Sequence, residues 1–248
     1  MKKSNNNTNF DRKESVPSKL DDDIFYNLEL DDDQKHFRDA IWNLEKIAVI
    51  CNSKAGTGKT TIALGVANIL VRYGLFDKIT YIISPTQEQR QGFLPGDQTS
   101  KTEPYMQPLV DALLTLGINP GTAIISENNL QSLKNGTAYI EFMADTYLRG
   151  VNFENRVVII DEAQNFYFDD LKKTLTRIHD NCKIILIGHT DQCDIYKKPE
   201  RTGFKPYLEA FNNCNDSRIE VCELTINHRG WFSNFCDNVS LRSKEYEK

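Results

Sequence analysis

The stretch 52–61, which reads NSKAGTGKTT, constrains the fold of this chain more than any other. It follows an apolar run at 47–50 and precedes a helix-patterned run at 61–74. Two closely spaced glycines let backbone N–H groups point into one concavity, at the positive end of the helix that follows. A strand, such a loop and a helix form a phosphate-binding loop, so we expect the chain to bind a nucleoside triphosphate. The alternative interpretation is a glycine-rich turn that binds nothing.

Each residue of this loop has an expected role. Lys59 reaches the β- and γ-phosphate oxygens, and the Thr60 hydroxyl ligates Mg²⁺. Gly56 and Gly58 leave room for the phosphates because they carry no Cβ. Ser53 stands where the motif has its first glycine, at the loop's entry, where a short hydroxyl side chain is tolerated. The expected nucleotide-binding residues of the loop are Ser53, Lys54, Ala55, Gly56, Thr57, Gly58, Lys59, Thr60 and Thr61.

A second motif, VVIIDEAQN at 157–165, supplies two carboxylates. An apolar strand delivers Asp161 to the carboxyl edge of the sheet, where it can hold Mg²⁺ through water. Glu162 can orient and deprotonate the attacking water. A carboxylate that only caps a helix is the alternative, which the phosphate loop weakens. A water-activating glutamate also argues against a small-molecule kinase, because a kinase must keep water away from the γ-phosphate.

Two glutamines complete the expected site. Gln192 lies a few residues beyond the apolar run 183–188, where it can sense the γ-phosphate; a solvated loop amide is the alternative. Gln34 lies upstream of the phosphate strand, and its carboxamide can read the hydrogen-bonding edges of adenine. From chemistry alone, an exposed helix glutamine is the favoured interpretation of Gln34.

The apolar pattern predicts an α/β fold with a doubly wound, mostly parallel sheet. Most of the expected strands are near-continuous apolar runs, which is typical of strands covered by helices on both faces. Helical patterns alternate with them, as in parallel sheets. The expected strands are 46–52, 78–84, 155–161, 183–188 and 218–225, and the expected helices are 34–46, 61–74, 108–117 and 169–180.

Composition bounds the domain organisation. With 248 residues, 40% hydrophobic and 26% charged, the chain can bury one large core. We expect residues 1–20 to be a flexible polar tail and residues 21–248 a single domain. The long polar insert 86–106, rich in glycine and proline, is expected to be a lid or interface loop.

Cysteine usage and targeting signals indicate a cytoplasmic protein. The six cysteines form no C-x-x-C pair, and the sequence contains no recognisable signal peptide or apolar run long enough to cross a membrane. Cys51 and Cys222 lie in apolar runs and are expected to be packed thiols. The net charge of -5 argues against indiscriminate binding of polyanions but leaves room for a local basic groove.

Taken together, these segments resemble the PhoH-like family of P-loop ATPases, which is related to superfamily 1 helicases. The resemblance runs from about Leu30 to about Asn238. Besides Gln34, it is carried by NSKAGTGKTT, GFLPGD (92–97) with the downstream PYMQPLVDAL, YLRG (147–150), VVIIDEAQN, LTRI (175–178) and IGHTDQCD.

The resemblance implies a RecA-like core, Mg²⁺-dependent ATP hydrolysis, and a role on RNA or single-stranded DNA. It makes Gln34 the adenine reader and Gln192 the γ-phosphate sensor. The segment ELTINHRG (223–230) is similar to a helicase motif whose arginine, here Arg229, contacts the γ-phosphate. His189 departs from the pattern, because family members commonly carry an aspartate there.

The chain has room for one RecA-like module, with one phosphate loop and one Asp-Glu strand. An arginine supplied by a neighbour can accelerate phosphoryl transfer by about 10³–10⁵. We therefore expect a homo-oligomer with the nucleotide near a subunit boundary, and family resemblance implies a hexamer. The candidate arginines are Arg229, Arg177 and Arg149, each of which has a solvated surface charge as its alternative. Arg229 is the first choice, because it follows a predicted strand in the same direction as the other site loops.

Two segments combine aromatic and basic residues and are candidates for a nucleic-acid surface. The first is the insert, with Arg90, Phe93, Lys101 and Tyr105, and the second is the terminal segment 231–248. In the latter, spacing favours the alternative that Trp231, Phe232 and Phe235 anchor a last helix. The competing function is an ATP-dependent switch that controls assembly or a protein partner and does not act on nucleic acid.

Overall fold

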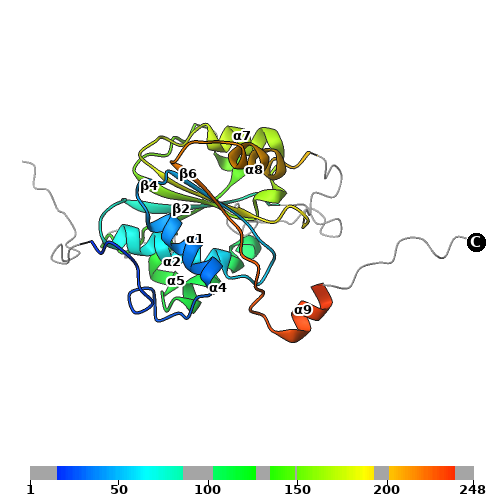
Figure 1. Ribbon diagram of the computed structural model, residues 1–248. Helices are drawn as coiled ribbons and strands as arrows, with labels where there is room; N and C mark the ends of the chain where they lie inside the picture. Colours follow the sequence, from blue (N-terminus) through cyan, green and yellow to red (C-terminus); the bar gives the residue numbers. More distant parts are fainter. Residues whose placement is uncertain (1–15, 86–102, 127–134, 149, 193–200, 238–248) are drawn as a thin grey trace, which may run out of the picture.

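The structure is a computed structural model that describes residues 16–85, 103–126, 135–148, 150–192 and 201–237 (Figure 1). Within this part of the chain, six strands form one sheet in the order β3-β2-β4-β5-β1-β6, and all neighbouring strands are parallel. The strands are β1 Ala48–Asn52, β2 Lys78–Ile83, β3 Ile140–Ala144, β4 Arg156–Ile160, β5 Lys183–Gly188 and β6 Ile219–Cys222. The expected doubly wound, RecA-like α/β architecture is confirmed.

Helices cover both faces of the sheet (Figure 1). One apolar cluster joins α1, α2, α4 and α5 to one face, and a second joins α7 and α8 to the other. Alternate residues of β1 enter different clusters, with Val49 in the first and Ile50 in the second, as the period of a strand requires. The helices are α1 Asp32–Trp42, α2 Lys59–Arg72, α4 Gln107–Thr115, α5 Pro120–Ala123, α7 Phe168–Leu175, α8 Phe204–Asn212 and α9 Trp231–Asp237.

The strand order makes β1 an inner strand, so the phosphate loop that follows it has a strand end on each side. β1 lies between β5 and β6, with Cys51 opposite Ile187 on one side and Cys222 on the other. The loop that leaves β1 therefore has the ends of two other strands as neighbours, where ligands of open parallel sheets bind. Burial raises the pKa of the Cys51 and Cys222 thiols to about 12, and their expected packing is confirmed.

The five expected strands are all present, but the expected helix ends differ. Phe37 and Ile41 are buried on α1 as predicted, whereas Leu44 is 53% exposed. The helix ends at Trp42, and the Trp42 side chain is buried. The helix predicted at 169–180 similarly ends at Leu175. Strand β3 and helices α5 and α8 were not expected.

The terminal aromatic residues do not anchor a helix to the body. α9 forms, but Trp231, Phe232 and Phe235 on it are 77%, 70% and 56% exposed. In Figure 1 the helix projects away from the sheet and its covering helices. The anchoring interpretation is therefore wrong for the described part of this segment.

The amino-terminal segment packs earlier than expected. Leu20 is 1% exposed, and the Trp42 indole donates a hydrogen bond to the Pro17 carbonyl at 3.1 Å. The packed part of the chain thus begins inside the predicted tail, of which residues 1–15 lie outside the described residues. Most of the predicted lid also lies outside them, including Arg90, Phe93 and Lys101. Its last residues form the 3₁₀ helix η1 Glu103–Met106, where Tyr105 packs against the first cluster.

In the described segments, every helix is too short or too polar to span a bilayer.

Candidate nucleotide-binding site

The phosphate loop has the backbone that its glycines predict. Gly56 and Gly58 both have φ of +82°, which side-chain-bearing residues rarely adopt. The Thr57 hydroxyl donates to the Lys54 carbonyl at 3.1 Å, and this bond closes the loop on itself. Lys59, the first residue of α2, is buried, and its ammonium donates to the same carbonyl at 3.3 Å. The Lys59 ammonium thus lies inside the concavity of the loop. Of the other expected loop residues, Lys54 is exposed, and Ala55 and Thr61 are partly exposed.

Ser53, the departure from the motif, is buried and bonded. Its hydroxyl accepts a hydrogen bond at 2.6 Å from the backbone N–H of Leu224, beyond the end of β6. It also lies 3.2 Å from the Cys51 thiol, and its own N–H donates to the Gly188 carbonyl at 2.9 Å. A glycine has no side chain to make the first of these bonds. The serine therefore ties the entry of the phosphate loop to the chain that leaves β6.

Asp161 lies against the phosphate helix. The Thr60 hydroxyl donates to Asp161 Oδ2 at 2.9 Å, and the Glu162 N–H donates to Oδ1 at 2.8 Å. The Tyr81 hydroxyl, from β2, also donates to Oδ2. Burial, and then the Asp161 charge, raise the pKa of Tyr81 well above its usual value, so the phenol remains a donor. The Thr60 and Asp161 oxygens are the type of ligand that Mg²⁺ prefers, so these residues fit the ion.

Glu162 follows Asp161 in a strained backbone conformation. It has φ of +49° and ψ of +44°, a left-handed conformation that non-glycine residues adopt at a cost of about 1–3 kcal/mol. The next residues form the 3₁₀ helix η4 Ala163–Asn165, and the Gln164 side-chain amide donates to Glu162 Oε2 at 2.5 Å. The two neighbouring carboxylates therefore have different partners: Gln164 binds that of Glu162, and the donors to Asp161 are the Thr60 and Tyr81 hydroxyls and the Glu162 N–H.

The sensor loop, residues 189–192, follows β5 at the same edge of the sheet. Its first two N–H groups are held by side chains: the His189 N–H donates to Gln164 Oε1 at 3.0 Å, and the Thr190 N–H donates to Asn52 Oδ1 at 3.1 Å. His189 is buried, and Gln192 is partly exposed, with its N–H 3.3 Å from the His189 carbonyl. The loop that carries Gln192 is therefore anchored beside both the phosphate strand and the acid pair.

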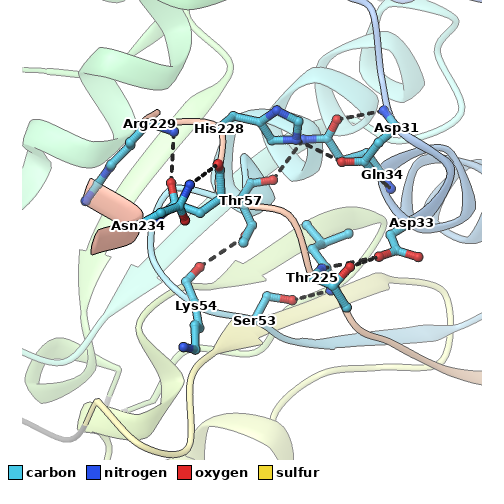
Figure 2. A network of polar contacts seen from close by, with 12 residues as sticks. Asp31, Asp33, Gln34, Ser53, Lys54, Thr57, Thr225, His228, Arg229 and Asn234 are labelled. Atoms are coloured by element: carbon cyan, nitrogen blue, oxygen red, sulfur yellow. Dashed lines mark hydrogen bonds and ion pairs between the residues drawn. The ribbon is translucent and has the colours of Figure 1, made fainter. Parts of the chain in front are cut away.

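On the other side of the phosphate loop, the 223–230 loop and the start of α1 form a polar network (Figure 2). The His228 N–H donates to the Gly56 carbonyl at 2.9 Å, and the His228 ring pairs with Asp31 at 2.8 Å. The Thr225 hydroxyl donates to Asp33 at 2.6 Å. A Cβ on Gly56 would lie 2.6 Å from Asn227 Oδ1, so the 223–230 loop needs a glycine there for its close approach.

Gln34 is part of this network (Figure 2). Its amide donates to the Thr57 carbonyl at 2.9 Å, and its Oε1 accepts from the Asp31 N–H at 3.1 Å. The side chain is buried, whereas an exposed helix glutamine was the interpretation that chemistry alone favoured. Both ends of the carboxamide bond to protein here, so reading adenine would require these bonds to exchange.

The candidate arginines lie in different environments. Methylene carbons of Arg229 lie 2.9 Å from the position of a Cβ on Gly56, so this side chain packs against the phosphate loop of its own chain. The Arg229 N–H is held by the Asn227 side chain at 2.8 Å. Arg177 donates to the carbonyls of Leu148, at 2.5 Å, and Val151, at 3.3 Å. Arg149 lies outside the described residues.

The structure thus brings together the phosphate loop, the acid pair, the sensor loop and Arg229 at one edge of the sheet. Three residues of the site were missed by sequence reasoning: Tyr81, Gln164 and His228. Gln164 lies inside the motif VVIIDEAQN and His228 inside ELTINHRG, so their position in these motifs is a sequence signal for the site. Tyr81 lies in the apolar run 78–83, where nothing sets it apart from a core residue.

Comparison with known proteins supports one family. A family model described as "PhoH-like protein" matches residues 29–229. Protein PhoH2 of Bacillus subtilis is 34% identical over 165 residues, which are 64% of this chain and 33% of that protein. Protein PhoH of Escherichia coli K12 is 32% identical over 179 residues, which are 72% of this chain and 48% of that protein. The chain therefore spans about half the length of these relatives, or less.

Among solved structures, the Hef helicase domain of Pyrococcus furiosus matches with a TM-score of 0.41 and 15% identity. The match covers 75% of this chain and 37% of that chain. A likeness this distant places none of the site residues.

Proposed function

Because this chain belongs to the PhoH-like protein family, we propose that it is a Mg²⁺-dependent ATPase that couples hydrolysis to RNA or single-stranded DNA. The observation that carries the hydrolytic part is the 2.9 Å bond between Thr60 and Asp161, which joins the phosphate helix to the acid strand. Lys59 lies in the same concavity, and Glu162 follows at the next position of the acid strand.

The residues divide the work by their chemistry. The loop amides and Lys59 bind the phosphates, and Thr60 and Asp161 hold Mg²⁺, which supplies charge stabilisation on the phosphoryl oxygens when bound. Glu162 orients water and takes its proton, and Gln192 reports the state of the γ-phosphate. Arg229 approaches the γ-phosphate from its own chain, a proposal supported by its packing against Gly56. Gln34 contacts adenine after its bond to Thr57 exchanges.

The first experiment measures phosphate release from ATP by the purified chain, with Lys59→Ala and Glu162→Gln as test variants. Both should abolish turnover; Lys59→Ala should also weaken nucleotide binding, whereas Glu162→Gln should hold ATP unhydrolysed. Lys172→Ala and Glu154→Gln change the same residue types at exposed positions and are the matched controls. Turnover of Glu162→Gln at the wild-type rate would refute the assignment of the base.

The nucleic-acid part is supported by the exposed aromatic residues of α9. The Trp231 and Phe235 rings stack with centroids 5.6 Å apart, and both are accessible to a base. We expect single-stranded RNA or DNA to stimulate the ATPase, and its affinity to fall steeply with salt. The measurement is the ATPase rate against polynucleotide concentration at two ionic strengths.

We further propose a homo-oligomer, with a hexamer as the expected size. Arg229, Arg177 and Arg149 are the arginines to test as the residue supplied to a neighbour, and of these Arg177 donates to two carbonyls of its own chain. Mass measurement in solution, with and without an ATP analogue and single-stranded RNA, tests assembly. A monomer under every condition would contradict this proposal.

A second candidate is an ATP-dependent switch that recruits a protein partner. The residues of α9, WFSNFCD, include no lysine or arginine to neutralise phosphates, which favours an apolar protein surface as its target. ATP hydrolysis that responds to none of the polynucleotides tried would favour this function.

A further inference from the structure

Gln164 lies between the proposed base and the sensor loop. Its side chain is 1% exposed, its amide donates to Glu162 Oε2 at 2.5 Å, and its Oε1 accepts from the His189 N–H at 3.0 Å. The orientation of the carboxamide is dictated by its partners, since an ionised carboxylate can only accept and a backbone N–H can only donate. One planar group therefore connects the acid strand to the first residue of the sensor loop.

The surrounding fold leaves just enough space for this connection. A Cβ on Gly188, the last residue of β5, would lie 2.7 Å from Gln164 Oε1. The same Cβ would meet Phe204 at 3.1 Å and the Ala163 N–H nitrogen at 3.2 Å, so Gln164 makes the tightest of the three contacts. The Gln164 carbonyl also accepts from the Thr202 hydroxyl at 2.8 Å, which fixes the turn from its other side.

We propose that Gln164 is a positioning residue that sets the Glu162 carboxylate relative to the sensor loop, so that the base is aligned only when the loop is. This inference rests on the proposed function, in which Glu162 activates water. Because the carboxamide is rigid and bonded at both ends, a shift of the loop backbone at His189 moves the group that holds Glu162. Gln164 itself acts through Glu162 and need not touch ATP.

The first test compares Gln164→Met, which removes both polar ends at similar size, with Gln164→Glu, which keeps an acceptor for His189 but places a second carboxylate against Glu162. Hydrogen bonds to charged groups are strong, so both variants should lower kcat by about 10–100-fold. KM and nucleotide affinity should stay within about threefold, because substrate binding does not use Gln164. A loss carried by KM instead of kcat would overturn the proposal.

Asn52→Ala is the matched control. Asn52 holds the next N–H of the same loop, that of Thr190, through a bond that does not involve Glu162. If Gln164 acts only by anchoring the loop, Asn52→Ala and Gln164→Met should lower kcat equally. Alignment of Glu162 predicts a loss at least about fivefold larger for Gln164→Met.

A double-mutant cycle with Gly188→Ala gives a test that does not depend on the Met and Glu variants folding well. Alone, Gly188→Ala forces the carboxamide aside and should lower kcat about tenfold. In the Gln164→Ala background the tightest contact of the new Cβ is gone and only those with Phe204, at 3.1 Å, and the Ala163 nitrogen, at 3.2 Å, are left, so the further loss should be under about threefold. Additive losses would overturn the proposal, as would wild-type kcat in Gly188→Ala. Thermal unfolding of each variant identifies losses due to misfolding.

The outcomes separate this inference from the proposed function. If Glu162→Gln is inactive but the Gln164 variants keep the wild-type kcat, this inference fails and the proposed function stands. An active Glu162→Gln refutes the assignment of Glu162 as the base.

Discussion

The two sides of the phosphate loop are held in different ways. On the acid side, Asp161 and its partner Tyr81 are buried, and the bonds among them are shielded from water. On the other side, the pairs Asp31–His228 and Asp33–Thr225 join α1 to the 223–230 loop at exposed or partly exposed positions. Shielded bonds preserve geometry, whereas exposed bonds exchange readily with water. The difference indicates that the acid side is preorganised. The other side, which carries Arg229 and leads to α9, is the adaptable side.

The largest expected effect is on the acid side. Tyr81→Phe removes a buried donor to Asp161, leaving Thr60 and the Glu162 N–H to hold the carboxylate. Bonds to charged groups contribute about 1.5–3 kcal/mol, so we expect kcat/KM to fall roughly 10–100-fold, with more Mg²⁺ needed for half-maximal rate. The measurement is a Mg²⁺ titration of the ATPase.

Tyr139→Phe is the control for this substitution. Burial raises the pKa of Tyr139 to about 12, and its hydroxyl bonds to Asn68 on α2, away from the acid pair. It should leave the Mg²⁺ dependence unchanged. If the two variants behaved alike, the acid side would not be preorganised through Tyr81.

The next effect concerns the bond that links the two sides. Ser53→Gly restores the residue of the motif but removes the acceptor for the buried Leu224 N–H. An unsatisfied buried donor costs about 1–3 kcal/mol, so we expect the free energy of unfolding to fall by about 1–2 kcal/mol in urea titration. Ser53→Ala separates loss of the hydroxyl from added backbone freedom. Wild-type stability of Ser53→Ala would mean that the hydroxyl does not contribute.

The sequence predicted the parts of the fold that are locally encoded. β1 and β4 are continuous apolar runs because both faces of each strand are covered. β3 was missed because it is an edge strand that is only partly buried and carries Glu141 at its second position, paired with Lys78 and Arg156. The predicted α1 ran too far because Leu44 continued its apolar spacing beyond the actual end at Trp42.

The candidate site was predicted as a set of motifs, without the contacts between them. Tyr81 and Asp161 are 80 positions apart, and Ser53 and Leu224 are 171 apart, so neither pair has a local signature. Lys183 is similar: it opens β5 as an apparent surface cation, yet its ammonium is buried against the Asn43 carbonyl at 2.7 Å. Burial lowers the pKa of Lys183 to about 7. Such contacts follow from strand order, which residue types alone do not specify.

A smaller effect is expected from the exposed pair on the adaptable side. His228→Ala removes the 2.8 Å contact with Asp31 but leaves the His228 N–H bonded to Gly56. Polar contacts at exposed positions contribute about 0.2–1 kcal/mol, so we expect the free energy of unfolding to fall by about 0.5 kcal/mol. Asp31→Ala should cost about 1 kcal/mol more, because Asp31 also caps α1 through the Gln34 N–H. A loss above 2 kcal/mol for His228→Ala would show that this side is as rigid as the acid side.

The smallest effect on stability is expected at α9, where the adaptable side ends. Substituting a buried tryptophan by alanine costs about 3–5 kcal/mol, whereas exposed positions usually change stability by less than about 0.5 kcal/mol. Trp231 is 77% exposed, so Trp231→Ala should leave thermal unfolding and basal ATPase unchanged. Stimulation by single-stranded RNA or DNA should nevertheless fall several-fold, because base stacking on an aromatic ring contributes about 1–3 kcal/mol. Exposed Leu114→Ala on α4 is the matched control, since it removes accessible apolar surface without a ring. A large drop in melting temperature for Trp231→Ala would mean that α9 packs against the body after all, and unchanged stimulation would move the strand-binding surface elsewhere.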